Sequence, residues 1–427
     1  MNKKFILLVF TLLLFSTTAS AQNLKAERIL HQNILKDIKK DIQEKYYDPK
    51  LRGVDIEENY KKTSDLIKNV ASSDEMSDLI ARFCLLFDDS HLYFLPPRKT
   101  VKVDYGWKLL LIDGKAFVTE IKDDSDAYKK GVRAGDQIYM IEGYIPNRQE
   151  FSMLRYHFQI LRPQTSLNLL LIKPSGNKYK LDVQAKIIRD NDFIPSTRDL
   201  MLEYQKNYSE NSRQIVYDKI PGLSILKMTS FNLTTIKVDK MMDKVEKSDA
   251  LILDLRGNGG GYLISLEQLV NNFFDKEVKV GKVIERDGIK SYSIQPHIKK
   301  PYTGKLVVLI DSDSASAAEI FARIVQLEKR GTVIGDQSAG AVMQAILMTH
   351  TFGLDSLIPY GVSVTVADLI MKDGQRLEKV GVTPDEKIVP TALDLANNRD
   401  PVLSRAAKIL GYQMTAEEAG QILGKDK

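Results

Sequence analysis

The spacing of hydrophobic residues changes twice along the chain. In residues 24–90 apolar residues recur every three or four positions, as Ile34 and Ile38 do, which is the spacing of one face of a helix. Pro49 ends the first of these helices because proline cannot continue a helix. The pattern predicts a small helical cap domain, to which we assign residues 22–98.

Residues 101–188 carry a different pattern, in which short apolar runs of strand length are separated by turns. Short strands combined with two helical segments predict a small, partly open β-barrel module with the bounds 99–190. The expected strands are 107–112, 116–121, 137–141 and 167–173, and the expected helices are 125–131 and 148–161.

From residue 213 to residue 392 strands alternate with helices. Ala250–Leu255 and Lys305–Ile310 have the continuous apolar character of buried strands, which is typical of a sheet covered by helices on both faces. The chain is therefore predicted to be α/β (α+β multidomain), with an α/β core over 191–427 that ends in one or two surface helices. The other elements expected in the core are helices at 263–274 and 316–328 and a strand at Thr332–Ile334.

Composition limits the class of protein without naming its activity. The 427 residues are 43% hydrophobic and 27% charged, which excludes a disordered or fibrous chain. The net charge of +5 comes from 61 basic and 56 acidic residues without a basic tract, so we expect neither a nucleic-acid partner nor an anionic membrane surface. The one cysteine, Cys84, excludes an internal disulfide and a cysteine-based zinc site, and we expect it to be buried. No metal or other cofactor is expected.

The N-terminus has the pattern of a secretory signal peptide. Lys3 and Lys4 precede an apolar run of 11 residues, Phe5–Phe15, and small residues follow up to Ala21. The run is too short to span a bilayer as a helix. We therefore expect residues 1–21 to be removed and the mature protein to be exported, periplasmic or secreted, without a stable membrane span. The alternative is an N-terminal membrane anchor.

A glycine cluster follows the first predicted buried strand of the core. The stretch from Leu251 to Tyr262 runs from a strand through Gly257, Gly259, Gly260 and Gly261 into a helix. Free backbone N–H groups at such a turn, beside a helix N-terminus, suit an anion. A phosphate is one such anion, but the P-loop pattern and the G-x-G-x-x-G pattern with its acidic strand end are absent. An oxyanion hole fits better.

Serines stand where the second buried strand gives way to a helix. Ser312, Ser314 and Ser316 each occupy a position from which a hydroxyl could lie near the positive end of that helix. Any of the three could also serve as an ordinary N-cap.

The two motifs together resemble the C-terminal processing peptidase and tricorn-like family of serine peptidases. In that family "DLR-x-N-x-GG" precedes a helix start "S-A-S/A-E", which is Ser316-Ala317-Ala318-Glu319 here. The resemblance implies a crotonase-like peptidase core in which Ser316 is the nucleophile. The oxyanion donors would be the backbone N–H groups of Ala317 and of either Gly259 or Gly260, with Asp254 and Arg256 bracing the loop.

The family divides by its general base. One branch uses a lysine in a "T-F-G-K-G" loop, but that position holds Ala341 in this chain. The tricorn-like branch uses a histidine in a "D-S-H-T-x-F" string, which matches Asp89-Ser90-His91. The resemblance thus implies that His91 is the base. The other histidines are assigned to a surface helix (His31), a helix of the second module (His157), a lysine-rich hairpin (His297) and a strand end (His350).

The third catalytic residue should orient the imidazole of the base. The run from Arg376 to Asp385 resembles the family string "E-G-V-G-V-x-P-D", which implies that Glu378 has this role. The alternative is a solvated pair of Glu378 and Lys379 on a hairpin.

The middle module resembles a bacterial PDZ domain through the run from Gly131 to Gly143. The resemblance implies that Tyr105, Gly106 and Trp107 form a loop that captures the C-terminal carboxylate of a peptide. The alternative is a module that only packs against its neighbour.

These features predict an exported serine endopeptidase that acts on unfolded or tail-exposed polypeptides through Ser316, His91 and Glu378. One alternative is an inactive scaffold that binds peptide tails. Another is a crotonase-like acyl-CoA enzyme, against which the export signal argues because acyl-CoA is cytosolic. Whether the subunits form a homo-oligomer is left open.

Overall fold

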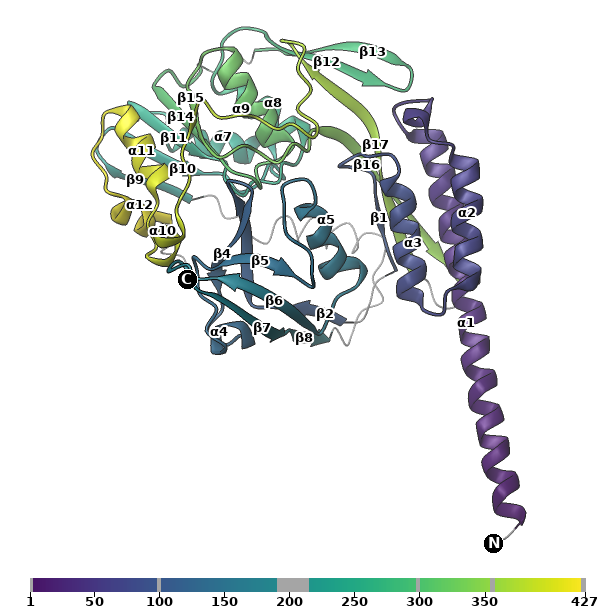
Figure 1. Ribbon diagram of the computed structural model, residues 1–427. Coiled ribbons are helices and arrows are strands. Elements are labelled where there is room, and N and C mark those ends of the chain that lie inside the picture. Colours follow the sequence, from purple (N-terminus) through teal and green to yellow (C-terminus); the bar gives the residue numbers. More distant parts are fainter. Residues whose placement is uncertain (1–2, 98–100, 190–214, 297–299, 354–357, 424–427) are drawn as a thin grey trace.

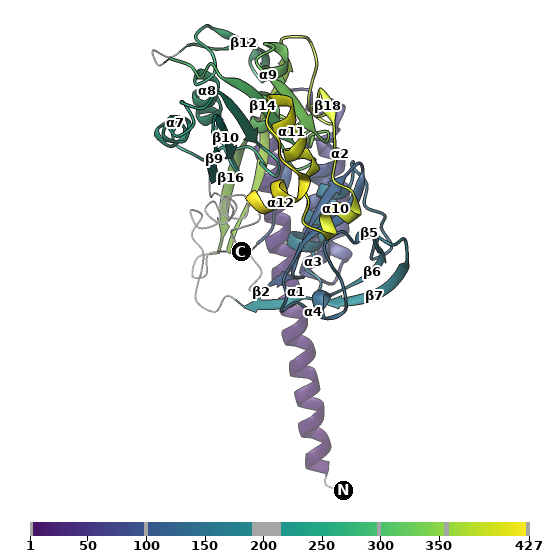
Figure 2. The same cartoon turned by 90° about the vertical axis from the view of Figure 1, so that its left-hand side faces the viewer.

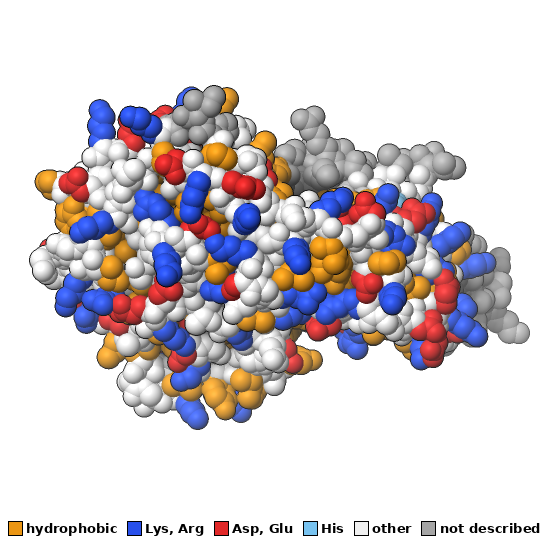
Figure 3. Space-filling model, turned by 90° about the horizontal axis from the view of Figure 1, so that it is seen from above, with side chains coloured by type: hydrophobic (Ala, Val, Ile, Leu, Met, Phe, Trp, Pro, Cys, Tyr) orange, Lys and Arg blue, Asp and Glu red, His pale blue; other side chains and the backbone are white. Residues whose placement is uncertain are grey.

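The computed structural model describes residues 3–97, 101–189, 215–296, 300–353 and 358–423. Helices and several sheets alternate through this part of the chain, so the fold is mixed α/β as predicted (Figure 1). Charges of both signs are interspersed over the face seen in Figure 3.

Three helices form the N-terminal part: α1 (Lys3–Lys45), α2 (Ile56–Asn69) and α3 (Ser73–Leu85), with a short turn of helix, η1 (Leu51–Gly53), after α1. Asp55 and Ser72 cap α2 and α3 by accepting the N–H groups of residues three positions on. The N-terminal half of α1 projects from the body of the molecule (Figure 1). No helix of the described residues combines the length and apolar character needed to cross a bilayer.

The helical part is joined to the C-terminal half of the chain through a shared sheet. Strand β1 (Tyr93–Leu95) pairs antiparallel with the 14-residue strand β17 (Ile358–Met371). Tyr360, Val362 and Val364 of β17 belong to the same buried cluster as the helices. The sheet also contains β12 (Val278–Glu285), β13 (Gly288–Ile294) and β16 (Met343–Phe352).

The predictions for Cys84 and His31 concern burial within these helices. Cys84 is fully buried, as predicted, and burial raises the pKa of its thiol to about 12. The assignment of His31 to a helix surface was wrong. His31 is fully buried between α1 and α3, where its ring contacts the hydroxyl of Ser77 at 3.1 Å. The helical spacing around it could not show that a second helix covers this face.

The middle module is a separate antiparallel sheet of five strands in sequence order. The four predicted strands are confirmed, each within one residue of its expected start and end. The helices are shorter than expected because a bend and turns take up residues 125, 130 and 131 of the first and turns take up residues 148–150 of the second. The elements are β3 (Trp107–Ile112), β4 (Lys115–Ile121), β5 (Gln137–Ile141), β6 (Ser166–Ile172), β7 (Lys178–Gln184), α4 (Asp126–Lys129), α5 (Phe151–Tyr156) and its continuation η2 (His157–Leu161), with β2 (Val101–Asp104) paired to β8 (Lys186–Arg189).

The core is a six-stranded sheet in the order β18-β15-β14-β11-β10-β9, parallel except for β9. Its two faces are covered by different helices, as the continuous apolar strands predicted. Its strands are β9 (Ile215–Ile220), β10 (Leu223–Lys227), β11 (Ala250–Asp254), β14 (Lys305–Ile310), β15 (Thr332–Gly335) and β18 (Glu386–Lys387).

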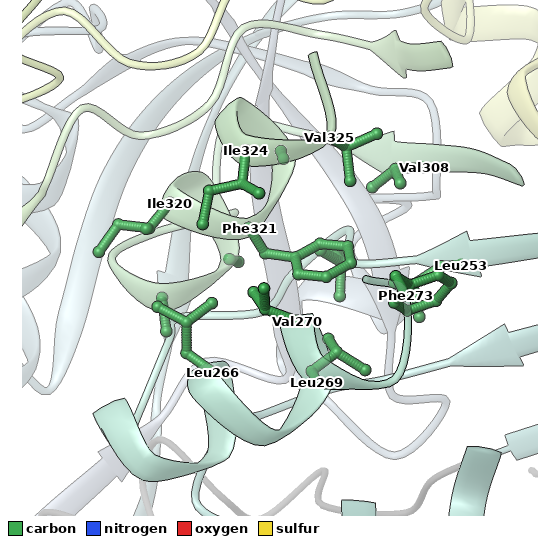
Figure 4. Close-up of a cluster of buried hydrophobic side chains, with 14 of the residues drawn as sticks. Leu253, Leu266, Leu269, Val270, Phe273, Val308, Ile320, Phe321, Ile324 and Val325 are labelled. Atoms are coloured by element: carbon green, nitrogen blue, oxygen red, sulfur yellow. The ribbon is translucent and has the colours of Figure 1, made fainter. Parts of the chain in front are cut away.

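One face of the core sheet is covered by α7 (Thr235–Asp243), α8 (Leu263–Asn271) and α9 (Ala317–Leu327). In Figure 4 Phe321 of α9 points toward Val270 of α8, and Val325 of α9 lies beside Val308 of β14; all four belong to one buried cluster. Burying such side chains stabilises the fold by about 1.5–3 kcal/mol each. This packing fixes the helix that begins directly after Ser316.

The opposite face is covered by α11 (Pro401–Leu410), whose residues Leu403, Ala406 and Ala407 are fully buried. This differs from the surface helices expected after Pro390, because the apolar side of α11 lies on the sheet. In Figure 2 the C-terminal helices α10 (Ala392–Ala396), α11 and α12 (Ala416–Leu423) lie nearest the viewer.

Candidate active site

Ser316 stands between β14 and α9, in a backbone conformation that L-residues seldom adopt. Its φ is 54° and its ψ is −117°. Such strain persists only where the surroundings hold it. The Ser316 N–H donates both to the carbonyl of Ala341, at 2.9 Å, and to Oε2 of Glu319, at 3.0 Å. These two acceptors hold the turn that presents the Ser316 side chain.

The other two candidate serines are engaged elsewhere. The Ser312 hydroxyl donates to the carbonyl of Leu111 in the middle module, at 2.6 Å. Ser314 is fully buried, and its hydroxyl donates to the carbonyl of Leu255 at 2.8 Å. Both therefore join neighbouring segments, which leaves Ser316 as the serine beside the glycine loop.

The glycine loop lies directly against Ser316. A Cβ atom at Gly260 would come within 2.6 Å of the Ser316 Cβ and 2.9 Å of the Ala315 carbonyl oxygen, so only glycine fits. The N–H of Gly260 donates to the side chain of Asn258 at 2.9 Å. Among the described residues, no hydrogen bond is donated by the N–H of Gly259 or of Ala317. Both amides belong to the predicted set of oxyanion donors, whereas the N–H of Gly260 is already engaged.

A buried ion network supports the loop from below. Arg256 pairs with Asp254 and with Asp400, the N-cap of α11, at 2.8 Å in each case. Burial disfavours the charge on Asp254, but Arg256 and Lys227 outweigh it and hold the pKa of that carboxyl well below its usual range. The contacts agree with the bracing role expected of Asp254 and Arg256.

His91 lies between α3 and β1, and its backbone is held by Asp89. Oδ1 of Asp89 accepts the N–H of His91 at 2.8 Å and the hydroxyl of Thr365 on β17 at 2.8 Å. Its Oδ2 accepts the hydroxyl of Tyr46 at 2.9 Å. Burial lowers the pKa of His91 from 6.5, although the charge of Asp89 opposes the shift. The imidazole is therefore neutral near pH 7 and can accept a proton.

Glu378 reaches His91 through an intervening hydroxyl. The sequence predicted that Glu378 orients the imidazole, but its Oε2 instead accepts the Ser90 hydroxyl at 2.9 Å. The oxygen of that hydroxyl lies 2.8 Å from Nδ1 of His91. Because Ser90 donates to Glu378, its oxygen accepts the Nδ1–H, which leaves Nε2 free to act as a base. Burial raises the pKa of Glu378, against the hydrogen bonds it accepts.

Ser90 is thus a residue that the sequence reasoning passed over. The sequence did place the Ser90 hydroxyl beside the proposed base in the matched string. The role of Ser90 nevertheless depends on the distant Glu378, which the string does not show. The alternative pairing of Glu378 with Lys379 does not occur, because the Lys379 ammonium lies 3.1 Å from Asp88.

The segment 338–342 connects the two halves of the site. Ala341 accepts the N–H of Ser316, and the next residue, Val342, donates its N–H to Glu378 at 2.9 Å. Ser316, His91 and Glu378, which lie far apart in the sequence, therefore converge around one short loop. The position where a lysine base would stand, Ala341, lies against the serine.

The predicted peptide loop of the middle module lies apart from these contacts. Tyr105 is buried and its ring stacks on Trp107 at 5.5 Å. The N–H of Gly106 donates to the carboxylate of Asp104 at 2.8 Å, and its carbonyl accepts the N–H of Lys122. Asp104 would have to move before this amide could bind a peptide carboxylate.

The remaining histidines are placed elsewhere. His157 lies 3.5 Å from Asp78, at the contact between the middle module and α3. His350 lies in β16, and its Nε2 is 2.6 Å from Asp41 of α1. His297 falls outside the described residues.

A strained serine at a helix start, a neighbouring glycine loop and a histidine linked to a carboxylate through a hydroxyl are features that a serine peptidase site requires. Residues 222–388, from β10 to β18, match the family model described as peptidase family S41. Residues 31–84, in the helices α1 to α3, match the model described as the Tricorn protease C1 domain. The chain therefore contains a peptidase family S41 domain, preceded by a helical segment that matches the Tricorn protease C1 domain.

Relatives of known name are proteases. The chain is 29% identical to the tail-specific protease of Haemophilus influenzae over 221 residues, which cover 49% of this chain and 30% of that protein. It is 28% identical to the carboxy-terminal processing protease CtpB of Bacillus subtilis over 291 residues, 65% of this chain and 54% of the relative. The match to each of these two proteins spans less than two thirds of its length. A carboxyl-terminal-processing protease of Picosynechococcus is 25% identical over 76% of this chain and 75% of its own.

Solved structures share the fold at low identity. Mature CPAF has a TM-score of 0.66 at 15% identity, over 94% of this chain and 99% of that chain. The photosystem II D1 C-terminal processing protease has a TM-score of 0.50 at 20% identity, over 86% and 96% of the two chains. These likenesses bear on the fold alone.

Proposed function

We propose that the protein is an exported serine endopeptidase that hydrolyses unfolded or tail-exposed polypeptides. The observation that carries the proposal is the run of contacts from Ser316 through Ala341 and Val342 to Glu378, Ser90 and His91. The names of the relatives, tail-specific and carboxy-terminal processing protease, support the substrate class.

In the proposed mechanism the Ser316 hydroxyl attacks the scissile carbonyl while Nε2 of His91 takes its proton. The N–H groups of Gly259 and Ala317 stabilise the oxyanion, which supports Gly259 over Gly260 as the glycine donor. Ser90 and Glu378 hold the Nδ1–H of His91 and stabilise the imidazolium. His91 then protonates the leaving amine, and water activated by the same histidine releases the acyl group.

The middle module is proposed to bind substrate tails through a PDZ-like loop at residues 105–107. Export is proposed from the N-terminal pattern of residues 1–21. The projection of this end of α1 from the folded body supports a segment that the fold does not need (Figure 1).

Labelling with a fluorophosphonate, which reacts with activated serines, tests the nucleophile. Wild type and Ser312→Ala should be labelled, whereas Ser316→Ala should not. Ser312 is the matched control because its hydroxyl binds the middle module instead of facing the glycine loop. Absence of labelling in folded wild type, together with retained binding of tail peptides, would favour the inactive scaffold.

A further inference from the structure

Glu319 is a buried acid for which the proposed mechanism has no use. It is the third residue of α9 and has no exposed surface. No ion pair among the described residues includes it. A buried carboxylate without a cation partner is costly unless hydrogen bonds compensate for the lost water.

Four donors surround the two oxygens of Glu319. Oε1 accepts the hydroxyl of Ser338 at 2.5 Å and the N–H of Gly340 at 2.8 Å. Oε2 accepts the N–H of Ala341 at 2.9 Å and that of Ser316 at 3.0 Å. All four belong either to the proposed nucleophile or to the loop that connects it to Glu378.

Each of the three N–H groups can only donate. A proton on the carboxyl could be accepted only by the Ser338 hydroxyl, which already accepts the N–H of Val382 at 2.6 Å and would have to give up its own donation to Glu319. At least one hydrogen of a side-chain amide would meet an N–H group. All four donors are therefore satisfied when Glu319 is ionised, and losing the charge would leave one of them without its acceptor.

We propose that ionised Glu319 is a positioning residue that fixes the strained backbone of Ser316 and the 338–341 loop in the geometry needed for attack. This inference rests on the proposed function. Breaking the hydrogen bonds to Glu319 would let the backbone of Ser316 relax. It would also displace Val342, whose N–H donates to Glu378. One side chain thereby fixes the positions of both Ser316 and Glu378, the acid that is linked to His91 through Ser90.

The surroundings make this role sensitive to pH. Burial raises the pKa of Glu319 to about 7, although its four hydrogen bonds oppose the shift. Arg148, between β5 and α5, is a charged group that interacts with Glu319, and Arg148 in turn interacts with Asp336, which follows β15. Burial lowers the pKa of His91. As the pH falls, Glu319 should therefore take up its proton before His91 does.

The test compares three variants with wild type in the full chain. Glu319→Gln removes the charge, and Ser338→Ala removes one donor to it. Glu328→Gln is the control, since Glu328 lies at the other end of the same helix and pairs with Lys276 and Lys372. Fluorophosphonate labelling rates, and kcat and KM on a fluorescent casein, are measured from pH 5 to 9, with thermal unfolding to verify folding.

We expect Glu319→Gln to lose on the order of 10²-fold in labelling rate and kcat, because misplacement of about 1 Å has such a cost. Its KM should stay within about threefold of wild type. The fall of kcat at low pH, here called the acid limb of the pH–rate profile, should become shallower and shift to lower pH. Ser338→Ala should move the acid limb to higher pH, because the anion loses a donor. Glu328→Gln should behave like wild type.

The outcomes separate this inference from the proposed function. If folded wild type is not labelled, the proposed function fails. If wild type is labelled and Glu319→Gln keeps its rate, or loses activity equally at all pH values, the positioning role is overturned. If Glu319→Gln does not fold, Ser338→Ala decides, since an unmoved acid limb in that variant rejects the proposal.

Discussion

The turn after β14, which carries Ser316, and the turn after α3, which carries His91, are anchored in different ways. The serine is held within the core, by the packing of α9 and by acceptors at residues 319 and 341. The histidine is held from outside its own segment, because Asp89 is bound by Tyr46 and Thr365 and Ser90 by Glu378. A local framework thus presents the proposed nucleophile, whereas long-range contacts present the proposed base.

This difference matters because the proposed base, His91, follows the helical part of the chain, whereas the proposed nucleophile, Ser316, lies in the core. Strands β1 and β17 pair across that division, and β17 contributes Thr365 as well as part of the helical cluster. Catalysis should therefore depend on the attachment of the helical part, while the environment of Ser316 should survive small changes there.

The largest effect should come from removing the base itself. We expect His91→Ala to lower kcat by about 10⁴-fold or more with little change in KM, since triad members act as a unit. His157→Ala is the matched control because its ring lies against Asp78 of α3 and has no part in the proposed mechanism. Casein turnover measures both. Near-normal activity of His91→Ala would remove the base from the proposed mechanism.

A smaller effect is expected from breaking the link behind the base. Ser90→Ala and Glu378→Gln should each lower kcat by about 10²-fold, because the Nδ1–H loses its fixed acceptor. The double variant should be little worse than either single one, since both residues act through the same contact. Full additivity in such a cycle would mean that Glu378 acts independently of Ser90.

The attachment of the helical part can be probed without touching the site. Thr365→Val and Tyr46→Phe each remove one hydroxyl from Asp89, and we expect kcat to fall several-fold as the His91 backbone loosens. Fluorophosphonate labelling should fall in parallel because it also needs the base. Tyr302→Phe is the control, since that hydroxyl binds the carbonyl of Ser248 in the core. An unchanged kcat in both test variants would show that β17 does not set the base.

The same division explains what the sequence could predict. Elements marked by a continuous or short apolar run, such as β11 and β14 or the strands of the middle module, were predicted nearly residue by residue. The strand, turn and helix start around the serines are consecutive in the chain, so the pattern located the glycine loop and three candidate serines, and the family resemblance then singled out Ser316. The contact of Gly260 with Ser316 then follows from neighbouring parallel strands ending at one edge.

What could not be predicted depends on pairings between distant residues. Ser90 acquires its role only when Glu378, 288 residues away, reaches it. The burial of His31 requires α3, and the burial of α11 requires the sheet, neither of which a local pattern reveals. Glu319 has the appearance of an ordinary capping residue until the 338–341 loop folds over it.

The smallest effect concerns His350, which ties β16 to α1. Its contact with Asp41 raises the pKa of His350 above 6.5, and Asp37 adds to the shift while burial and Lys40 oppose it. A group whose pKa is raised on folding contributes stability that is complete below pH 6.5 and is lost as the pH rises through the folded pKa. His350→Gln should therefore destabilise the protein at pH 5.5, by about 1 kcal/mol, and hardly at all at pH 8.5.

His157→Gln should have the opposite sign, because burial lowers the pKa of His157 and its protonation at low pH disfavours the fold. Thermal unfolding of both variants at the two pH values measures the contrast, and equal shifts at both pH values would mean that the His350–Asp41 pair does not help attach the helical part.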